Sequence, residues 1–400
     1  MKRILVLLAF LASAVVANAQ FHYQDYRNPE MLRHVNRHKP MRKEIVLPQV
    51  NGYNVYKADL HTHSIFSDGI VLPDYRVLEA WLDGLDVIAV TEHIEYRPHE
   101  RTMANYLNNY IEGSGKEVKN IDLIVKNPDP DGIQVDLNYS YERAAQQSES
   151  NGYGLTVIRG SEITRDPNAI GHYNALFTKD NNTIYDPDPV KAIRNAKAQG
   201  ALVMHNHPGW VRTTVSFTEV DKIAYGEGLV DGVEVMNTDE FYPSIIDRVQ
   251  KWGLFIAANS DIHASTASDY TLGGNYRPMT LILAKDKSPE SLKEALQAGR
   301  TIAYAFNTIC GSEQLLTELF KASVSVKTIN DKGANAPVTV WLTNNTSLDY
   351  YLVVNGGNEI YLAPFSTILV KGRFTERKIP VKVVNMFCSE NQHPEVLLAF

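Results

Sequence analysis

The sequence predicts an α/β protein in which a barrel of strands and helices is followed by a small antiparallel β-sandwich. Apolar runs alternate with helix signals from about residue 52 to 310, which is typical of parallel βα units. Beyond about residue 315, short strands follow one another between turn residues, which favours a sandwich. A chain of 400 residues is also too long for one small core, so we expect a large and a small domain.

The first 19 residues read as a secretory signal peptide. Lys2 and Arg3 precede an apolar stretch over residues 4–16, and Ala17-Asn18-Ala19 forms a cleavage site. A transmembrane anchor is the alternative, but the stretch is short for a span, so we favour cleavage. We therefore expect an exported protein, periplasmic or secreted, with no membrane span after cleavage. Residues 20–51 are polar and basic and are expected to form a solvated lead-in segment.

Charge and cysteine content argue against two classes of site. With a formal net charge of −7, the chain is a poor candidate for binding a nucleic-acid polymer through its phosphates. Its two cysteines, Cys310 and Cys388, cannot supply a zinc–thiolate site. They are expected either to pair in a disulfide or to be buried as small apolar residues.

Three helices of the predicted barrel carry clear start and stop signals. Asp188 and Pro189 supply an N-cap and a first-turn proline for a helix that Gly200 ends. Residues 288–299 repeat this pattern, and residues 73–84 share its proline and glycine. The helices at 73–84 and 189–200 lead at once into apolar strands, so we expect the barrel strands to run parallel.

Acidic and histidine residues follow the apolar runs of the predicted barrel, at the point where each strand ends. They are His61 and His63 after residues 57–60, Glu92 and His93 after 86–91, Glu162 after 155–160, His205 and His207 after 201–204, and Asp261 and His263 after 254–259. Barrels of parallel strands place these ends at one face, and residues two apart in a strand point the same way. One such residue alone is usually an ordinary core or loop residue. Together they predict the polynuclear metal site of a hydrolase, because burying so many polar groups without metal would be costly.

The C-terminal part shows no such cluster. Residues 312–320 are expected to form a linking helix, and five short strands are expected at 324–327, 338–342, 350–354, 368–370 and 381–384. We therefore divide the mature chain into a barrel at 52–315 and a β-sandwich at 316–400, with the chemistry confined to the barrel.

Several of the strand-end residues lie in motifs that resemble, in order, those of the PHP (polymerase and histidinol phosphatase) superfamily. The motifs are His61-Thr62-His63-Ser64, Ser67-Asp68-Gly69, Thr91-Glu92-His93, Gly160-Ser161-Glu162, Gly171-His172, His207-Pro208-Gly209 and Ser260-Asp261-Ile262-His263. The resemblance covers about residues 52–310. It implies a distorted (β/α)7 barrel with metal-dependent phosphoesterase activity. The chain looks most similar to exported bacterial phosphodiesterases of this superfamily.

The resemblance also implies a ligand set for two or three divalent ions. The first ion would be held by His61, His63, Glu162 and Asp261; the second by Glu162, His172 and His207; and the third by Asp68, His93 and His263. Many members have histidine where this chain has Asp68, and aspartate is a common variant. Histidine-rich sites with mixed nitrogen and oxygen ligands suit Zn, Mn or Fe.

Further residues are candidates for roles around the ions. His205 is expected on the same strand face as His207, where it would support the metals or contact the substrate. Arg277 and Arg300 are candidates for binding phosphoryl oxygens. Glu92 and Asp59 are expected to orient neighbouring histidines.

Charge favours a phosphate-ester substrate. Three divalent ions bring six positive charges and three carboxylates return three, so about three remain to attract an anion. Two ions would lower the pKa of a bridging water and supply hydroxide, with Glu162 as the catalytic bridge, while the third would orient the ester. We therefore predict hydrolysis of a small-molecule phosphate ester, and of a diester in particular. The alternatives are a phosphomonoesterase, an amide or carbamate hydrolase on the same barrel, and a binding protein with an inert barrel. Nothing in the sequence indicates an oligomeric state.

Overall fold

The computed structural model describes residues 41–99, 119–120, 133–134, 136–163, 171–331, 333 and 336–400. The predicted signal peptide and residues 20–40 of the lead-in segment lie outside this part of the chain. Residues 42–400 form one compact unit. Within the described residues, no helix combines the length and the apolar character that a bilayer span requires.

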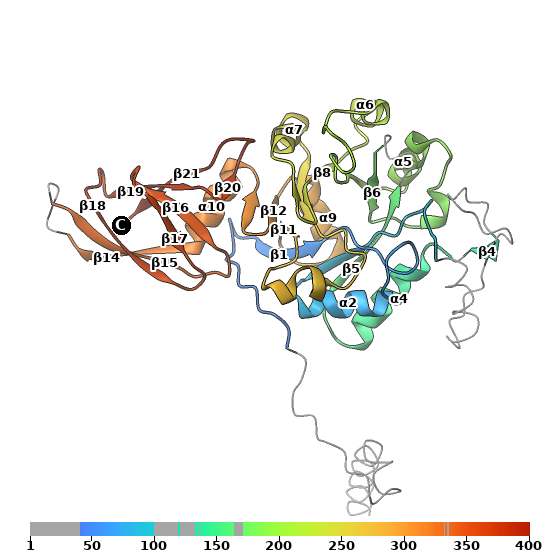
Figure 1. Ribbon diagram of the computed structural model, residues 1–400, viewed down its shortest axis with the longest axis horizontal. Coiled ribbons are helices and arrows are strands. Elements are labelled where there is room, and N and C mark those ends of the chain that lie inside the picture. The colour runs from blue at the N-terminus through green and yellow to red at the C-terminus, as the bar shows by residue number, and fades with distance from the viewer. Residues whose placement is uncertain are drawn as a thin grey trace, which may run out of the picture. The chain divides into compact units, whose positions relative to one another are not determined.

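The centre of this unit is a curled mixed sheet, 12-stranded in the described residues, with helices along its outer side (Figure 1). In spatial order its strands are β10 (Phe255–Asn259), β8 (Gly232–Asn237), β7 (Leu202–His205), β6 (Tyr173–Leu176), β5 (Thr156–Ile163), β2 (Val87–Val90), β1 (Asn54–Asp59), β11 (Met279–Ala284), β12 (Thr301–Ala305), β13 (Thr308–Cys310) and β20 (Met386–Phe387), with β9 (Glu240–Phe241) beside β8. A separate pair consists of β3 (Lys119–Asn120) and β4 (Ile133–Gln134). The α/β barrel predicted from the sequence is confirmed.

Threonine side chains, instead of a backbone ladder, connect β10 at one end of the described sheet to β11 and β12. The backbone of β10 donates to Thr280 Oγ1 of β11 and to Thr301 Oγ1 of β12, each at 3.1 Å. Beyond the strand ends, Thr62 and Ile262 form an isolated parallel bridge. The carboxyl ends of β1 and β10 are therefore held side by side, although they are far apart in the sequence.

One strand of the site departs from the predicted parallel order. β1, β2 and β5 are parallel neighbours, as are β7, β8 and β10. β6 runs antiparallel to both β5 and β7, although helix α5 (Pro189–Ala198) connects β6 to β7. A helix between two strands thus does not guarantee a parallel pair. The amino end of β6 consequently lies at the face where β5 and β7 end.

The three helices with predicted end signals are confirmed. The barrel helices are α2 (Pro73–Leu82), α4 (Tyr139–Ser150), α5, α6 (Glu219–Gly226), α7 (Ser244–Trp252) and α9 (Pro289–Gln297), with short turns at η2 (Asn181–Thr183), α8 (Thr266–Asp269) and η3 (Thr271–Gly273). Asp188 accepts hydrogen bonds from Val190 N and Lys191 N at the start of α5, and Ser288 caps α9. Gly200 follows α5 with φ +83°, a conformation that glycine adopts without strain.

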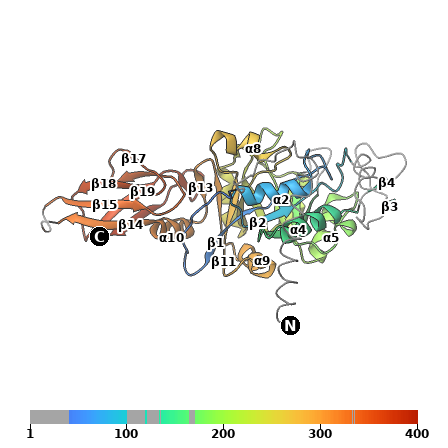
Figure 2. The same cartoon turned by 90° about the horizontal axis from the view of Figure 1, so that it is seen from below.

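Two antiparallel sheets follow helix α10 (Glu313–Ser323) and confirm the predicted sandwich (Figure 2). One contains β14 (Val324–Asn330), β15 (Val338–Asn344) and β18 (Thr367–Gly372); the other contains β17 (Glu359–Leu362), β16 (Tyr350–Val354), β19 (Lys378–Val383) and β21 (Glu395–Ala399). Alternate residues of both sheets are buried in one cluster, for example Val340 and Leu342 on β15 and Leu352 on β16. The boundary predicted at residue 315 falls inside α10.

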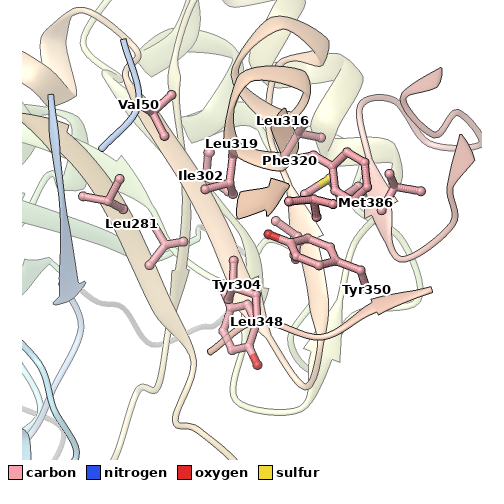
Figure 3. Packing of buried hydrophobic residues seen from close by; sticks show 14 of the residues in the cluster. Val50, Leu281, Ile302, Tyr304, Leu316, Leu319, Phe320, Leu348, Tyr350 and Met386 are labelled. Carbon is pink, nitrogen blue, oxygen red and sulfur yellow. The ribbon is translucent and has the colours of Figure 1, made fainter. Parts of the chain in front are cut away.

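A single hydrophobic cluster joins the sandwich to the barrel (Figure 3). It contains Leu281 and Tyr304 of the barrel sheet, Phe320 of α10, and Tyr350 and Met386 of the C-terminal strands. The rings of Phe320 and Tyr350 lie 5.1 Å apart, edge to face. β20 also pairs directly with β13. The two parts therefore share a core and a sheet.

The two cysteines are free and buried. Cys310 lies in register with Phe387 across the β13–β20 pair, and Cys388 follows the end of β20. Each cysteine packs in a different hydrophobic cluster. Of the two expectations for the cysteines, the structure agrees with burial as apolar residues.

The shared core predicts a single unfolding transition. We expect Met386→Ala to lower the free energy of unfolding by about 2–5 kcal/mol, because this side chain is completely buried at the junction. In urea, fluorescence and circular dichroism should report one coincident transition. Met41→Ala is the matched control, since Met41 is 87% exposed, and it should have little effect. Two separate transitions in the wild-type protein would contradict the shared core.

Candidate metal centre

All nine predicted ligands lie together at the face where the parallel strands end. They fall into four overlapping groups, and within each group the ligand atoms lie within 4.8 Å of one another. The groups are His61, His63 and Glu162; His61, His207 and Asp261; Glu162, His172 and His207; and His63, Asp68, His93 and His263. Because the groups share members, they form one continuous centre.

The first part of the centre is built from the ends of β1, β5 and β10. Asp261 N donates to His61 O (2.9 Å) and His63 N donates to Ile262 O (3.2 Å), which fixes these two strand ends together. The Nε2 atoms of His61 and His63 are 3.1 Å apart. They lie 3.4 and 3.3 Å from Glu162 Oε2, and 3.2 and 3.1 Å from Asp261 Oδ1. Two imidazoles and two carboxylates thus converge on one point.

The second part uses the other oxygen of Glu162. Glu162 Oε1 lies 3.0 Å from His172 Nδ1 and 3.6 Å from His207 Nε2. His172 precedes the antiparallel strand β6, and this reversed direction is what places it at the same face. Glu162 therefore stands between two groups of histidines, the position expected of a bridging ligand.

The third part lies at a more open edge of the centre. Asp68 approaches His263 Nε2 at 3.2 Å and His93 Nε2 at 3.3 Å. The ring of His63 stacks with that of His93 and with that of His263, with 4.4 and 4.5 Å between the centroids. A Cβ on Gly69 would lie 2.9 Å from the backbone of His63, so only glycine fits the turn that presents Asp68. The His263 side chain is 39% exposed, which leaves this edge accessible.

The electrostatics of the centre match a site for cations. Three buried oxygens, Glu162 Oε2, Asp261 Oδ1 and Asp68 Oδ1, accept no hydrogen bond from the described residues. Burial alone would lower the pKa of His93, but the charges of Glu162 and Asp68 outweigh it and raise the pKa to about 10. Burial would raise the pKa of Glu162, yet His93 and His61 hold it well below its usual range. Imidazole nitrogens and carboxylate oxygens in this arrangement fit divalent ions.

Sequence reasoning missed Glu234, which is completely buried beneath the centre. Its Oε1 lies 3.0 Å from His61 Nδ1, and its Oε2 accepts a hydrogen bond from His207 N at 2.8 Å. A carboxylate on the far nitrogen of a ligand histidine fixes the orientation of its ring. Glu234 lies in the middle of β8, not at a strand end, so the strand-end pattern passed over it. The sequence does contain a sign of its role, because an acidic residue stands inside the otherwise apolar run Gly232-Val233-Glu234-Val235-Met236.

Glu92 and Asn206 also support candidate ligands through hydrogen bonds. Glu92 accepts a hydrogen bond from Ser67 Oγ (2.5 Å), and Ser67 Oγ lies 3.2 Å from His63 Nδ1, so Glu92 orients His63 through this serine, as expected. Asn206 was not singled out from the sequence. Its Nδ2 donates to Glu162 Oε1 at 3.1 Å and supports the bridging position.

Arg277 does not reach the centre, and the catalytic role expected for it is not supported. Its guanidinium is completely buried and donates to Asp59 Oδ2 at 2.5 Å and to Ser260 Oγ at 3.1 Å. Asp59 in turn accepts from the backbone of His61 and of Ser260, each at 3.2 Å, instead of from a histidine ring. Arg277 and Asp59 thus position the backbone of the ligand strands. Arg300 likewise binds elsewhere, with Glu294 and Leu283 O as partners.

His205 also lies outside the four groups. Its ring stacks on Tyr173 with 4.9 Å between centroids, and its Nδ1 lies 3.0 Å from Tyr225 OH. Burial lowers the pKa of His205 to about 4. We expected it on the same face as His207, but His207 follows the end of β7 with φ +22°, so the alternation of a strand does not extend to it.

A cavity of about 400 Å³ adjoins the centre at Asp261 and His263. Its walls include Asp239, Tyr270 and Phe306. The cavity gives a ligand of the third part of the centre room for an organic substituent.

Comparison with solved structures places the chain in a family. A two-domain protein from Bacteroides vulgatus, described as containing a predicted PHP-like metal-dependent phosphoesterase, is 31% identical, with a TM-score of 0.76. The match covers 91% of this chain and 100% of that chain. An amidohydrolase from Chromobacterium violaceum is 12% identical over 60% of this chain and 96% of that chain, with a TM-score of 0.36. No family model and no curated protein matches the chain. The chain belongs to the PHP-like metal-dependent phosphoesterases, as its motifs indicated.

Proposed function

We propose that this protein hydrolyses phosphate esters, and phosphodiesters in particular, at a centre of two or three divalent ions. The observation that carries the proposal is the position of Glu162, whose two oxygens face two different groups of histidines. Membership of the PHP-like family supports the ester class. The preference for diesters rests on the resemblance of the motifs to those of exported phosphodiesterases.

The ligand set suits Zn, Mn or Fe. When bound, such ions activate water as a nucleophile and polarise phosphoryl oxygens. The chain's own residues fix where this happens. Glu162 sets the spacing of the first two positions, while Glu234 and Glu92 keep the Nε2 atoms of His61 and His63 directed into the centre. Asp68, His93 and His263 would hold a third ion at the open edge, where an ester can reach it.

The charge balance supports an anionic substrate. Glu234 and Glu92 add two more buried carboxylates, so with three ions the surplus falls from about three to about one positive charge. A surplus of this size still favours a phosphate ester over a neutral amide. The cavity beside His263 offers room for one ester substituent.

An activity panel tests the proposal. Protein loaded with Zn, Mn or Fe(II) is assayed with bis(p-nitrophenyl) phosphate, p-nitrophenyl phosphate and a p-nitroanilide. We expect both phosphate esters to turn over far faster than the anilide, the diester fastest, and inorganic phosphate to inhibit competitively. Turnover of the anilide without inhibition by millimolar phosphate would replace the phosphoesterase proposal with an amide hydrolase.

Metal binding should release protons at neutral pH. Nearby carboxylates outweigh burial and raise the pKa of His61, His207 and His263, and they raise the pKa of His93 to about 10, so in the metal-free protein these rings keep their protons to higher pH than a free imidazole does. A ligand imidazole must be neutral, and metal affinity should therefore rise with pH. Calorimetric titration with Zn in two buffers of different ionisation enthalpy measures the protons released. Equal heats in both buffers would contradict the protonation states described here.

We also propose that the protein is exported after removal of residues 1–19, on the strength of its N-terminal sequence. N-terminal sequencing of the mature protein should begin just after Ala19. A mature chain that still begins at Met1 would overturn this proposal.

A further inference from the structure

An exposed indole stands beside the second part of the metal centre. The centroid of the Trp210 ring lies 5.5 Å from that of His172 and 5.4 Å from that of His207. The Trp210 side chain is nevertheless 42% exposed. The ring therefore lies against two candidate ligands with part of its surface, and the rest is exposed beside the centre.

The loop that carries Trp210 is firmly held. Trp210 N donates to His207 O (3.0 Å), and Arg212 donates to Gly209 O through its backbone and to Pro208 O through its guanidinium. A Cβ on Gly209 would lie 2.5 Å from the ring of Tyr242, so the loop backbone packs directly on that ring. Trp210 is thus placed before any substrate binds, which lowers the entropic cost of using it as a contact.

The backbone next to Trp210 is strained. Val211 has φ +48°, a conformation that is unfavourable for a β-branched residue, and its side chain is 67% exposed. Strain of this kind persists where the surrounding structure imposes it, and it concentrates at functional sites. Packing of the Val211 side chain does not explain it, because that side chain faces solvent. Val211 directly follows Trp210, so the strained position adjoins the residue at the edge of the centre.

We propose that Trp210 is a stacking platform for a flat ring in the substrate, so that the preferred substrates are phosphate esters that carry an aryl or heterocyclic group. This inference rests on the proposed phosphoesterase function. An ion held by Glu162, His172 and His207 would place a phosphoryl group next to the indole, within reach of its ester substituent. Flat rings stack favourably on the face of an indole, whereas a small alkyl group gains little there.

Binding of three phosphonates to the Zn-loaded protein tests this proposal by calorimetry. Phenyl-, cyclohexyl- and methylphosphonate share one anionic head and differ only in the organic group. We expect phenylphosphonate to bind roughly tenfold more tightly than methylphosphonate, with cyclohexylphosphonate closer to the methyl compound. Trp210→Ala should abolish the phenyl advantage while leaving metal content and methylphosphonate affinity unchanged, and Trp210→Phe should retain most of it. Trp341→Ala is the matched control, because Trp341 is also 42% exposed but lies in the sandwich, and it should change nothing.

The outcomes separate the two proposals. If phenylphosphonate keeps its advantage in Trp210→Ala, or cyclohexylphosphonate binds as well as phenylphosphonate, the stacking proposal is wrong and the phosphoesterase proposal stands. If Trp210→Ala loses metal, Trp210 only supports His172 and His207, and the stacking proposal is again wrong. If none of the phosphonates binds the Zn-loaded protein, the phosphoesterase proposal itself fails.

Discussion

Glu162→Gln should abolish most of the activity and remove metal from the centre. The Glu162 carboxylate is completely buried, and its two oxygens lie within 3.4 Å of His61 and His63 on one side and 3.0 Å of His172 on the other. Glutamine has nearly the same shape, but it is neutral and its amide nitrogen cannot bind a cation. The change would therefore leave an oxygen for at most one of the two proposed ions and remove the negative charge between them.

Each bound ion contributes several kcal/mol of transition-state stabilisation, so we expect kcat/KM for a phosphate ester to fall roughly a thousandfold or more. Elemental analysis after reconstitution with Zn should show fewer ions per chain than in the wild type. Glu149→Gln makes the same chemical change at an exposed position on α4 and should leave both quantities unchanged. Normal metal content and activity in Glu162→Gln would show that Glu162 does not bridge the ions.

Arg277→Met should produce the largest loss of stability of the variants considered. Arg277 pairs with Asp59 at 2.5 Å, and both side chains are completely buried. Burial would lower the pKa of Arg277, but Asp59 and Asp83 raise it instead, so the guanidinium stays charged. Removing one partner leaves the charge of Asp59 buried and unpaired, which typically costs about 3–5 kcal/mol.

Thermal and urea unfolding of Arg277→Met measure this effect. Asp59 accepts from the backbone of His61 and Ser260, so metal affinity should weaken as well. Arg194→Met is the control, because Arg194 pairs with Glu227 at the surface, and its melting temperature should match that of the wild type. An Arg277→Met protein of normal stability and metal content that has lost activity would restore the direct catalytic role that the sequence suggested.

The candidate ligands could be predicted because most of them lie in a pattern that is local in the sequence. Five strands end in histidine or acidic residues, and a strand end is recognisable from the apolar run before it. His172 and Asp68 lie outside that pattern and came only from the resemblance of their motifs. The structure brings all nine residues together, since parallel strands share one carboxyl face and β6 reverses to present His172.

The supporting residues could not be predicted because their partners are remote in the sequence. Asp59 and Arg277 are 218 residues apart, and Glu234 lies 173 residues from His61. No local pattern indicates which buried charges will pair across a barrel. Trp210 was not predicted for a related reason. Only the fold shows that its ring lies beside the rings of His172 and His207.

The count of ions per chain tests the central claim most directly. Protein purified without chelator and reconstituted with Zn or Mn, then freed of loosely bound metal, is measured by elemental analysis against protein concentration. The nine converging ligands predict two or three ions per chain. One ion or none after reconstitution would contradict the polynuclear centre on which the proposed function rests.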